Sequence, residues 1–312
     1  MRTFAFVFPG QGSQTVGMLD AWGDHPAVRD TLAEASDALG TDIGRLIHEG
    51  PKEQLDLTTN TQPVMLAAAV ACYRAWMAET GLAPALVAGH SLGEYSALVA
   101  AGSLTLADAL PLVRFRAQAM QEAVPVGVGA MAAILGLDSE VVRVTCAEVA
   151  AAVGEPVEAA NFNDPKQIVI AGTKGAVDQA CEALKGRGAK RALPLAVSAP
   201  FHSSLMKPAA ERLQERLLSV TLRAPAIPLV NNIDVAVQTD PDAIREALYR
   251  QAFGPVRWVE VVQAIRARGA THLFECGPGK VLAGLARRID ASLVVGNVLD
   301  PATLAEAKGL LQ

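Results

Sequence analysis

The chain has 312 residues, of which 51% are hydrophobic and 19% are charged, and its formal net charge is -5. This composition provides enough apolar side chains for a large core and excludes an intrinsically disordered chain. The negative charge argues against a general nucleic-acid binder, and no apolar run reaches the length of a membrane span. The N-terminal apolar segment is too short for a secretory leader, and the four scattered cysteines fit a reducing compartment. We therefore expect a cytoplasmic protein that binds neither membranes nor nucleic acid.

The N-terminal part of the chain alternates between short apolar strands and longer helices. Residues 3–8 and 84–88 are expected to be buried strands, because their apolar runs are nearly continuous. Residues 63–79, with Pro63 in the first turn, and residues 106–122 are expected to be helices. Such alternation is typical of an α/β sheet with parallel strands.

From about Gly129 the pattern changes. The expected elements are a strand at 130–136, a helix at 139–153 capped by Asp138, strands at 157–161 and 167–171 around a turn at 163–165, a helix at 175–186 and a strand at 190–197. The order β-α-β-β-α-β is that of a ferredoxin-like unit.

Beyond this unit the alternating pattern resumes. The expected elements are a helix at 207–219, a strand at 228–231, helices at 241–252 and 256–268, a strand at 272–275, a helix at 280–289 and a strand at 294–297. The sequence thus predicts a doubly wound α/β domain built from residues 1–125 and 200–312. A ferredoxin-like α+β subdomain is inserted over residues 126–199.

The pentapeptide Gly89-His90-Ser91-Leu92-Gly93 has the G-x-S-x-G spacing of a nucleophile elbow. It lies between the strand at 84–88 and a helix that begins near Glu94, which is the structural context that this motif requires. The positive end of the helix dipole is aimed at the serine, where negative charge would develop. We interpret Ser91 as a candidate nucleophile; the alternative is a tight turn with a solvated serine.

A serine nucleophile needs a base that removes its proton. Among the five histidines, His90 adjoins the serine, where neighbouring side chains diverge. His202 lies in a loop that re-enters the main domain after the insertion, and it follows Ser91 in chain order, as in elbow enzymes. His202 is therefore the favoured base, with a surface or packed histidine as the alternative.

Two further residues have chemistry that the fold alone does not require. Arg116 shares a helix face with Leu112 and Met120, and a guanidinium in an apolar stripe needs an anion. That anion is either a substrate carboxylate or a local acidic side chain. Gln11 follows the first strand, and its amide N–H together with the Leu92 backbone N–H can form an oxyanion hole; the alternative is a polar turn residue. We expect no metal site and no nucleotide-binding loop, because zinc-ligand and phosphate-loop spacings are absent from the sequence.

Motifs along nearly the whole chain resemble the malonyl-CoA:acyl-carrier-protein transacylase family. They are FPGQGSQ at 8–14, GHSLGE at 89–94, RFR at 114–116, ANFN at 160–163, APFHS at 199–203, PVRW at 255–258 and ECGPG at 275–279. The resemblance implies an α/β-hydrolase-like fold with a ferredoxin-like insertion.

The resemblance also implies roles for individual residues. Ser91 is the implied nucleophile and His202 the base, which the main-chain carbonyl of Gln251 orients in place of a carboxylate. Arg116 is the implied carboxylate clamp. Gln11 and the Leu92 N–H are the implied oxyanion hole. Further expected substrate-binding residues are His90, Met120, Asn161 and Phe201, with Asn163 near the site and Phe201 crowding an extra α-methyl group.

The implied reaction transfers malonyl from malonyl-CoA to the phosphopantetheine thiol of acyl carrier protein through malonyl-Ser91, and it supplies fatty acid elongation. No tightly bound cofactor is expected. The candidate docking charges for an acidic carrier protein are Lys190, Arg191, Arg287 and Arg288; the alternative for each is a solvated surface charge. The alternative function is a serine esterase or thioesterase of the same broad fold, which predicts a carboxylate partner for His202. A third hypothesis is a domain that only binds carrier protein.

Overall fold

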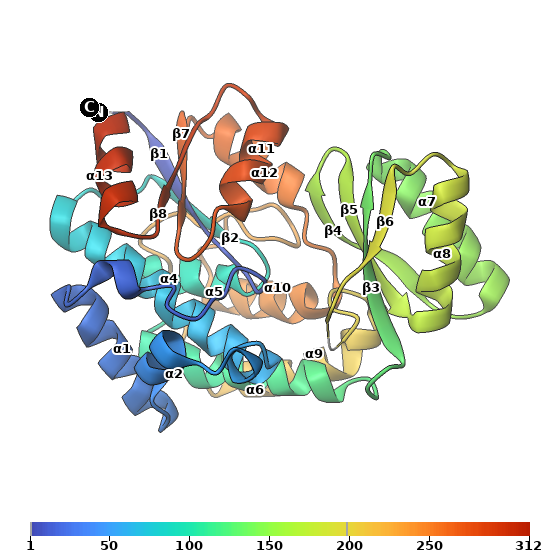
Figure 1. Cartoon of the computed structure of the whole chain (residues 1–312), viewed down its shortest axis with the longest axis horizontal. Coiled ribbons are helices and arrows are strands. Elements are labelled where there is room, and N and C mark those ends of the chain that lie inside the picture. Colours follow the sequence, from blue (N-terminus) through green and yellow to red (C-terminus); the bar gives the residue numbers. More distant parts are fainter. Residues whose placement is uncertain (1, 198) are drawn as a thin grey trace.

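The computed structural model describes residues 2–197 and 199–312, and within them the strands form two sheets of four strands each (Figure 1). The first sheet is parallel and has the order β2-β1-β7-β8. Its strands are β1 (Phe4–Phe8), β2 (Leu86–Gly89), β7 (His272–Cys276) and β8 (Val294–Val298).

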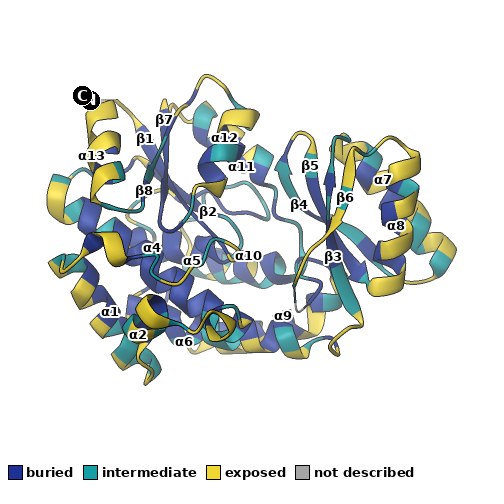
Figure 2. Cartoon of the chain, in the orientation of Figure 1, coloured by how far each residue is buried: buried dark blue, intermediate teal, exposed yellow. Residues whose placement is uncertain are grey.

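Both faces of the parallel sheet are buried, because successive side chains of a strand point to opposite sides (Figure 2). Phe6 and Phe8 pack into the larger core, whereas Ala5 and Val7 join the smaller one. The larger core includes side chains of α1 (Pro26–Leu39), α2 (Ile43–Glu49), α3 (Lys52–Leu55), α4 (Thr58–Thr80), α5 (Gly93–Ala100), α6 (Leu106–Glu122), α9 (Lys207–Leu218), α10 (Pro241–Phe253) and α13 (Pro301–Leu310). The smaller core includes α11 (Trp258–Ala267) and α12 (Val281–Ile289). Helices on both faces confirm the predicted doubly wound α/β arrangement.

The second sheet is antiparallel and has the order β4-β5-β3-β6. Its elements are β3 (Gly129–Leu135), α7 (Ser139–Val153), β4 (Val157–Asp164), β5 (Gln167–Thr173), α8 (Lys174–Gly186) and β6 (Arg191–Pro194). The helices α7 and α8 cover one face, where Ile134 and Ile170 belong to a separate core. On the other face Met131 and Val169 pack near Phe201, so this face is turned toward the parallel-sheet unit. The strand and helix order is the one predicted for a ferredoxin-like unit.

The strand β4 joins the two units. The Phe162 N–H donates to the Val256 carbonyl and the Val256 N–H donates to the Ala160 carbonyl, each over 2.9 Å. The Arg288 guanidinium of α12 forms an ion pair with Asp164 at 2.6 Å. These contacts fix the antiparallel sheet both to the segment that follows α10 and to α12.

Several predicted bounds are wrong for identifiable reasons. The helix α4 begins at Thr58 rather than Pro63, because the Thr61 hydroxyl bonds the Leu55 and Leu57 carbonyls and holds an earlier first turn. The expected turn at 163–165 begins later, since Asp164 still pairs with Gln167 across the β4–β5 hairpin.

Other expectations differ in the strength of an element. Residues 228–231 form isolated bridges through Leu229 and Val230 rather than the predicted strand. Asp138 precedes α7, but its carboxylate bonds Lys166 at 2.7 Å instead of capping the helix. The helices between residues 26 and 55, and α13 at the C-terminal end, were not predicted.

Replacing Phe6 tests the larger core. Its fully buried ring packs edge-on against Phe4 and Trp76, with centroids 5.3 Å away in each case. Phe6→Ala should lower the free energy of unfolding by about 3–5 kcal/mol, because it removes buried surface and leaves a cavity. Leu218→Ala, at a side chain that is 76% exposed, should change it by less than about 0.5 kcal/mol. Denaturant unfolding of both variants checks this, and equal losses would contradict it.

Candidate active site

Ser91 lies on a turn whose backbone is held in the left-handed region, with φ of 53°. The turn joins β2 to α5, and two glycines permit it. A Cβ on Gly89 would lie 1.9 Å from the Gly93 carbonyl, and a Cβ on Gly93 would lie 2.0 Å from the Phe8 carbonyl oxygen. The G-x-S-x-G spacing is therefore a steric requirement of this turn, which presents Ser91 at the carboxyl end of the sheet.

The Ser91 hydroxyl contacts a histidine from a distant part of the chain. Ser91 Oγ lies 2.7 Å from His202 Nε2, and His202 Nδ1 lies 2.9 Å from the Gln251 carbonyl and 3.2 Å from the Gly254 carbonyl. Because carbonyl oxygens only accept, Nδ1 must carry the proton in the neutral ring, which leaves Nε2 to accept from Ser91. Among the described residues, no carboxylate contacts this imidazole.

His202 is buried, and its surroundings disfavour a charged ring. Burial, followed by the positive charge of Arg116, lowers the pKa of His202 to about 3, although the bond to the Gln251 carbonyl acts in the opposite direction. The imidazole is therefore neutral at physiological pH and able to accept a proton from Ser91.

Arg116 lies beside the serine with its guanidinium buried. One terminal nitrogen donates to Gln62 Oε1 at 2.8 Å, and the other donates to Ser91 Oγ and Gln251 Oε1, both at 3.3 Å. The guanidinium also lies over the Tyr95 ring, 5.5 Å from its centroid. No carboxylate of the described residues contacts it, and its Nε is buried without a partner among them. The guanidinium therefore has no carboxylate in direct contact within the described structure. The buried Glu94 acts on its charge only through space, with the Gln251 side chain hydrogen-bonded to both groups.

A cavity of about 680 Å³ brings most of the candidate residues together between the two units. It is lined by Gln11, Gly12, Gln14, Lys52, Asp56, Gln62, His90, Ser91, Leu92, Arg116, Met131, Asn161, Asn163, Val169, Leu195, Ala196, Val197, Phe201 and His202. Met120 is instead buried in the larger core, on the helix that carries Arg116.

The remaining polar groups of the cavity differ in how they are held. The Leu92 N–H, at the start of α5, has no hydrogen-bond acceptor among the described residues. The Gln11 side chain donates to Thr58 Oγ1 at 3.3 Å. His90 Nε2 lies 2.8 Å from Asn163 Oδ1, and its ring meets Trp258 edge-on, so its orientation is fixed.

The four cationic residues considered for carrier docking are exposed and lie on two separate elements. Arg191 begins β6 and Lys190 directly precedes it, while Arg287 and Arg288 lie in the last turn of α12. Arg287 donates to the Val295 carbonyl at 3.2 Å, and Arg288 is paired with Asp164. None of the four is among the described residues that line the cavity.

Two further observations concern other ligands. Within the described residues, no group of three or more His, Cys, Asp or Glu side chains is arranged to hold a metal ion. In the same part of the chain, no helix is long and apolar enough to cross a membrane.

Sequence reasoning missed three residues that hold the site. Gln62 fixes the Arg116 guanidinium, and its only signal was a polar side chain directly before the apolar run that begins at Pro63. Glu94 is a buried carboxylate directly after the elbow, where an acidic residue among apolar neighbours was the available signal. Asn232 bonds the elbow from a segment that carried no recognisable motif.

The lowered pKa of His202 makes stability depend on pH. The unfolded chain takes up a proton on this residue below its ordinary pKa near 6.5, whereas the native chain does so only near 3. Stability is therefore lost as the pH falls. The free energy of unfolding should decrease relative to that of His202→Gln by roughly 1 kcal/mol per pH unit between pH 6 and 5. Urea unfolding at several pH values measures this difference, and parallel curves for the two proteins would contradict it.

Comparison with known proteins agrees with this geometry. The acyl transferase domain family matches residues 5–288. A malonyl CoA-acyl carrier protein transacylase of Escherichia coli strain K12 is 54% identical over 308 residues, which are 98% of this chain and 99% of that protein. One from Bacillus subtilis strain 168 is 46% identical over 305 residues, covering 97% of this chain and 96% of that protein.

Solved structures give the same result. An acyl-carrier-protein S-malonyltransferase from Burkholderia pseudomallei 1710b has a TM-score of 0.96 and 67% identity, over 98% of this chain and 99% of that one. A malonyl-transacylase in complex with its type II PKS acyl-carrier protein has a TM-score of 0.95 and 52% identity, over 98% of both chains. This chain therefore belongs to the acyl transferase family and, within it, to the malonyl CoA-acyl carrier protein transacylases.

Proposed function

We propose that the protein transfers a malonyl group from malonyl-CoA to the phosphopantetheine thiol of acyl carrier protein, through a malonyl ester on Ser91. The observation that carries this proposal is the buried Arg116 guanidinium, which contacts no carboxylate of the described residues and lies 3.3 Å from the Ser91 hydroxyl. A free cation beside the nucleophile fits an acyl group that bears its own carboxylate. The names of the relatives point to the same acyl group.

The first half-reaction forms the acyl-enzyme. Ser91 Oγ attacks the thioester carbonyl while His202 Nε2 accepts its proton, and the Gln251 carbonyl holds the resulting imidazolium through Nδ1–H. The Leu92 N–H and the Gln11 amide stabilise the oxyanion. The C–S bond then breaks, and the coenzyme A thiolate takes the proton from His202.

The second half-reaction discharges the enzyme. The phosphopantetheine thiol gives its proton to His202 and attacks the malonyl ester carbonyl. The ester C–O bond breaks, Ser91 Oγ recovers the proton, and malonyl-carrier protein leaves. Both substrates bring their own reactive groups, so the reaction requires no bound cofactor. Because all four cysteines are buried thiols, a reducing cytoplasm suits the protein.

The same cavity accounts for selection of the acyl group. Arg116 can grip the free malonyl carboxylate through two nitrogens in both half-reactions. An uncharged acyl group would leave this buried cation unpaired, which disfavours it. We propose His90, Asn161 and Phe201 as further contacts on the cavity wall, with the half-buried Phe201 ring restricting α-substituents.

Other parts of the chain have supporting roles in this proposal. The segment 126–199, as an inserted subdomain between the segments 1–125 and 200–312, supplies the opposite wall of the cavity through Met131 and Val169. Met120, on the same helix as Arg116, packs into the larger core and helps to hold that helix in place. Four exposed cations are candidates for contacts with an acidic carrier protein: Lys190, Arg191, Arg287 and Arg288.

An esterase or thioesterase of the same broad fold is the less favoured function. That alternative predicted a carboxylate partner for His202, whereas carbonyl oxygens of Gln251 and Gly254 lie at Nδ1. A hydrolase of this kind also has no need for the buried Arg116 guanidinium beside its serine. A domain that only binds carrier protein would not need the 2.7 Å contact between Ser91 and His202.

Mass spectrometry of the quenched enzyme tests the reaction. Incubation with malonyl-CoA should add one malonyl group to Ser91, and acyl carrier protein should remove it much faster than water does. Ser91→Ala is the control and should gain no mass. Rapid hydrolysis without an adduct would favour the hydrolase, and no adduct and no turnover would favour the binding domain.

Replacing Arg116 tests the carboxylate clamp. Because charge-assisted hydrogen bonds contribute about 1.5–3 kcal/mol each, Arg116→Ala should lower kcat/KM for malonyl-CoA by roughly tenfold to a hundredfold or more. Acetyl transfer should fall far less, since acetyl has no carboxylate. Arg114→Ala is a matched control on the same helix, where the guanidinium bonds the Leu39 carbonyl instead. Equal losses for malonyl and acetyl would exclude this role.

A further inference from the structure

The backbone at Ser91 must be held in place by its surroundings. A residue other than glycine with φ of 53° carries strain of about 1–3 kcal/mol and keeps that conformation only where neighbouring contacts enforce it. The fully buried Asn232 makes those contacts on both sides of the serine. Its Oδ1 accepts the Ser91 N–H at 2.7 Å, and its Nδ2 donates to the Gly89 carbonyl at 2.7 Å. The side-chain amide of Asn232 is thus hydrogen-bonded to the backbone of the elbow at two points.

Glu94 connects Asn232 to Gln251, the residue whose carbonyl orients His202. A single carboxylate oxygen accepts the Asn232 N–H at 2.9 Å and Gln251 Nε2 at 3.0 Å. Gln251 Nε2 also donates to the Ser91 carbonyl at 3.1 Å, while the Gln251 main-chain carbonyl accepts from His202. Nucleophile and base are therefore positioned by one buried network of hydrogen bonds.

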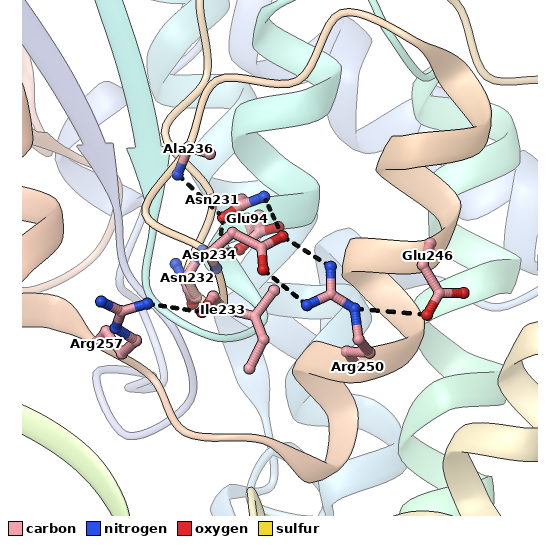
Figure 3. Close-up of polar contacts among 9 residues, drawn as sticks. All are labelled: Glu94, Asn231, Asn232, Ile233, Asp234, Ala236, Glu246, Arg250 and Arg257. Carbon is pink, nitrogen blue, oxygen red and sulfur yellow. Dashed lines mark hydrogen bonds and ion pairs between the residues drawn. The ribbon is translucent and has the colours of Figure 1, made fainter.

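The loop that carries Asn232 is itself fixed from outside. Asn232 belongs to the loop of residues 231–236, called the 231–236 loop below. Within it, Asn231 Oδ1 accepts the Asp234 N–H at 2.9 Å, and the Asn231 N–H donates to the Ala236 carbonyl at 3.0 Å. Arg250 grips the Asp234 carboxylate through two bonds of 2.7 Å, and Arg257 donates to the Ile233 carbonyl at 3.2 Å (Figure 3).

Two adjacent residues at the end of α10 connect these contacts. Arg250 holds the 231–236 loop through Asp234, while Gln251 holds Glu94 and His202. The Asp234–Arg250 pair is partly exposed, with side-chain exposures of 28% and 36%. Neither Asn232, Asp234 nor Arg250 is among the described residues that line the cavity. These residues can therefore affect the position of Ser91 without touching the substrate.

We propose that Asn232 is a positioning residue for the nucleophile, and that the Asp234–Arg250 pair is its remote support. This proposal rests on the proposed function, because the acylation assay uses malonyl-CoA as the substrate. Its consequence is that loss of either support slows attack by Ser91 while substrate binding stays the same.

Single-turnover acylation by malonyl-CoA tests the proposal. Removing two neutral hydrogen bonds of about 1 kcal/mol each, Asn232→Ala should slow formation of malonyl-Ser91 by roughly tenfold to a hundredfold. Asp234→Ala removes the ion pair that supports the loop and should slow acylation by a smaller factor. The concentration of malonyl-CoA that gives the half-maximal rate should stay within twofold for both variants. Asp242→Ala is the matched control, because Asp242 pairs with Arg245 on the same helix and should leave the rate unchanged.

A second readout separates this inference from the proposed function. The rate at which a small phosphonofluoridate modifies Ser91 should fall in parallel with acylation in both variants, since it depends on the serine and not on malonyl recognition. If wild-type protein reacts with this probe but never forms malonyl-Ser91, the proposed function fails and the probe still tests Asn232.

If Asp234→Ala is modified by the probe and acylated at the wild-type rates, with thermal unfolding unchanged, the remote support is overturned. If Asn232→Ala reacts at the wild-type rates, the whole inference is overturned. A raised half-maximal concentration with an unchanged maximal rate would also overturn it. If Asn232→Ala does not fold, the half-exposed Asp234→Ala variant decides.

Discussion

The close approach of the Ser91 elbow to the end of β1 is the constraint on which the rest of the site depends. Because a side chain on Gly93 would collide with the Phe8 carbonyl, α5 begins closer to the end of β1 than any residue but glycine would allow. The turn leaves Ser91 strained and half-buried at the edge of the cavity, and it aims the Leu92 N–H into the same space. Every other functional group is arranged around a serine whose position the sheet has already determined. Buried polar contacts must then supply what keeps the strained backbone from relaxing.

The cavity holds a neutral imidazole and a charged guanidinium side by side. His202 is held by carbonyl oxygens, which orient the ring without contributing a full negative charge, so its pKa stays low and the ring stays neutral. A carboxylate at the same place would raise the basicity of the imidazole and would also attract the nearby Arg116. In the proposed reaction, orientation by a carbonyl serves both groups, since the histidine remains deprotonated and the guanidinium remains available for an anion from the substrate.

The two units meet where these groups converge. The segment from Gln251 to Val256 orients His202 at its start and bonds β4 of the antiparallel sheet at its end. The wall that carries Asn161 and Asn163 is thereby tied to the same stretch of chain that positions the base. The Arg288–Asp164 pair adds a second connection between the units. The relative position of the two cavity walls is thus set by the short-range contacts of the strand β4.

Sequence by itself determined the α/β pattern, the ferredoxin-like order of the middle segment, the elbow at Ser91 and the choice of His202 and Arg116. These features depend on local patterns of apolar and small residues, which are readable along the chain. It did not predict where α4 begins, and it found neither Gln62 nor Asn232. Only the tertiary structure decided these contacts: Asn232 lies 141 residues after Ser91, and its role comes from one amide group that reaches two backbone groups across that separation. Such a bond leaves no periodicity or spacing in the sequence, because folding alone brings its partners together.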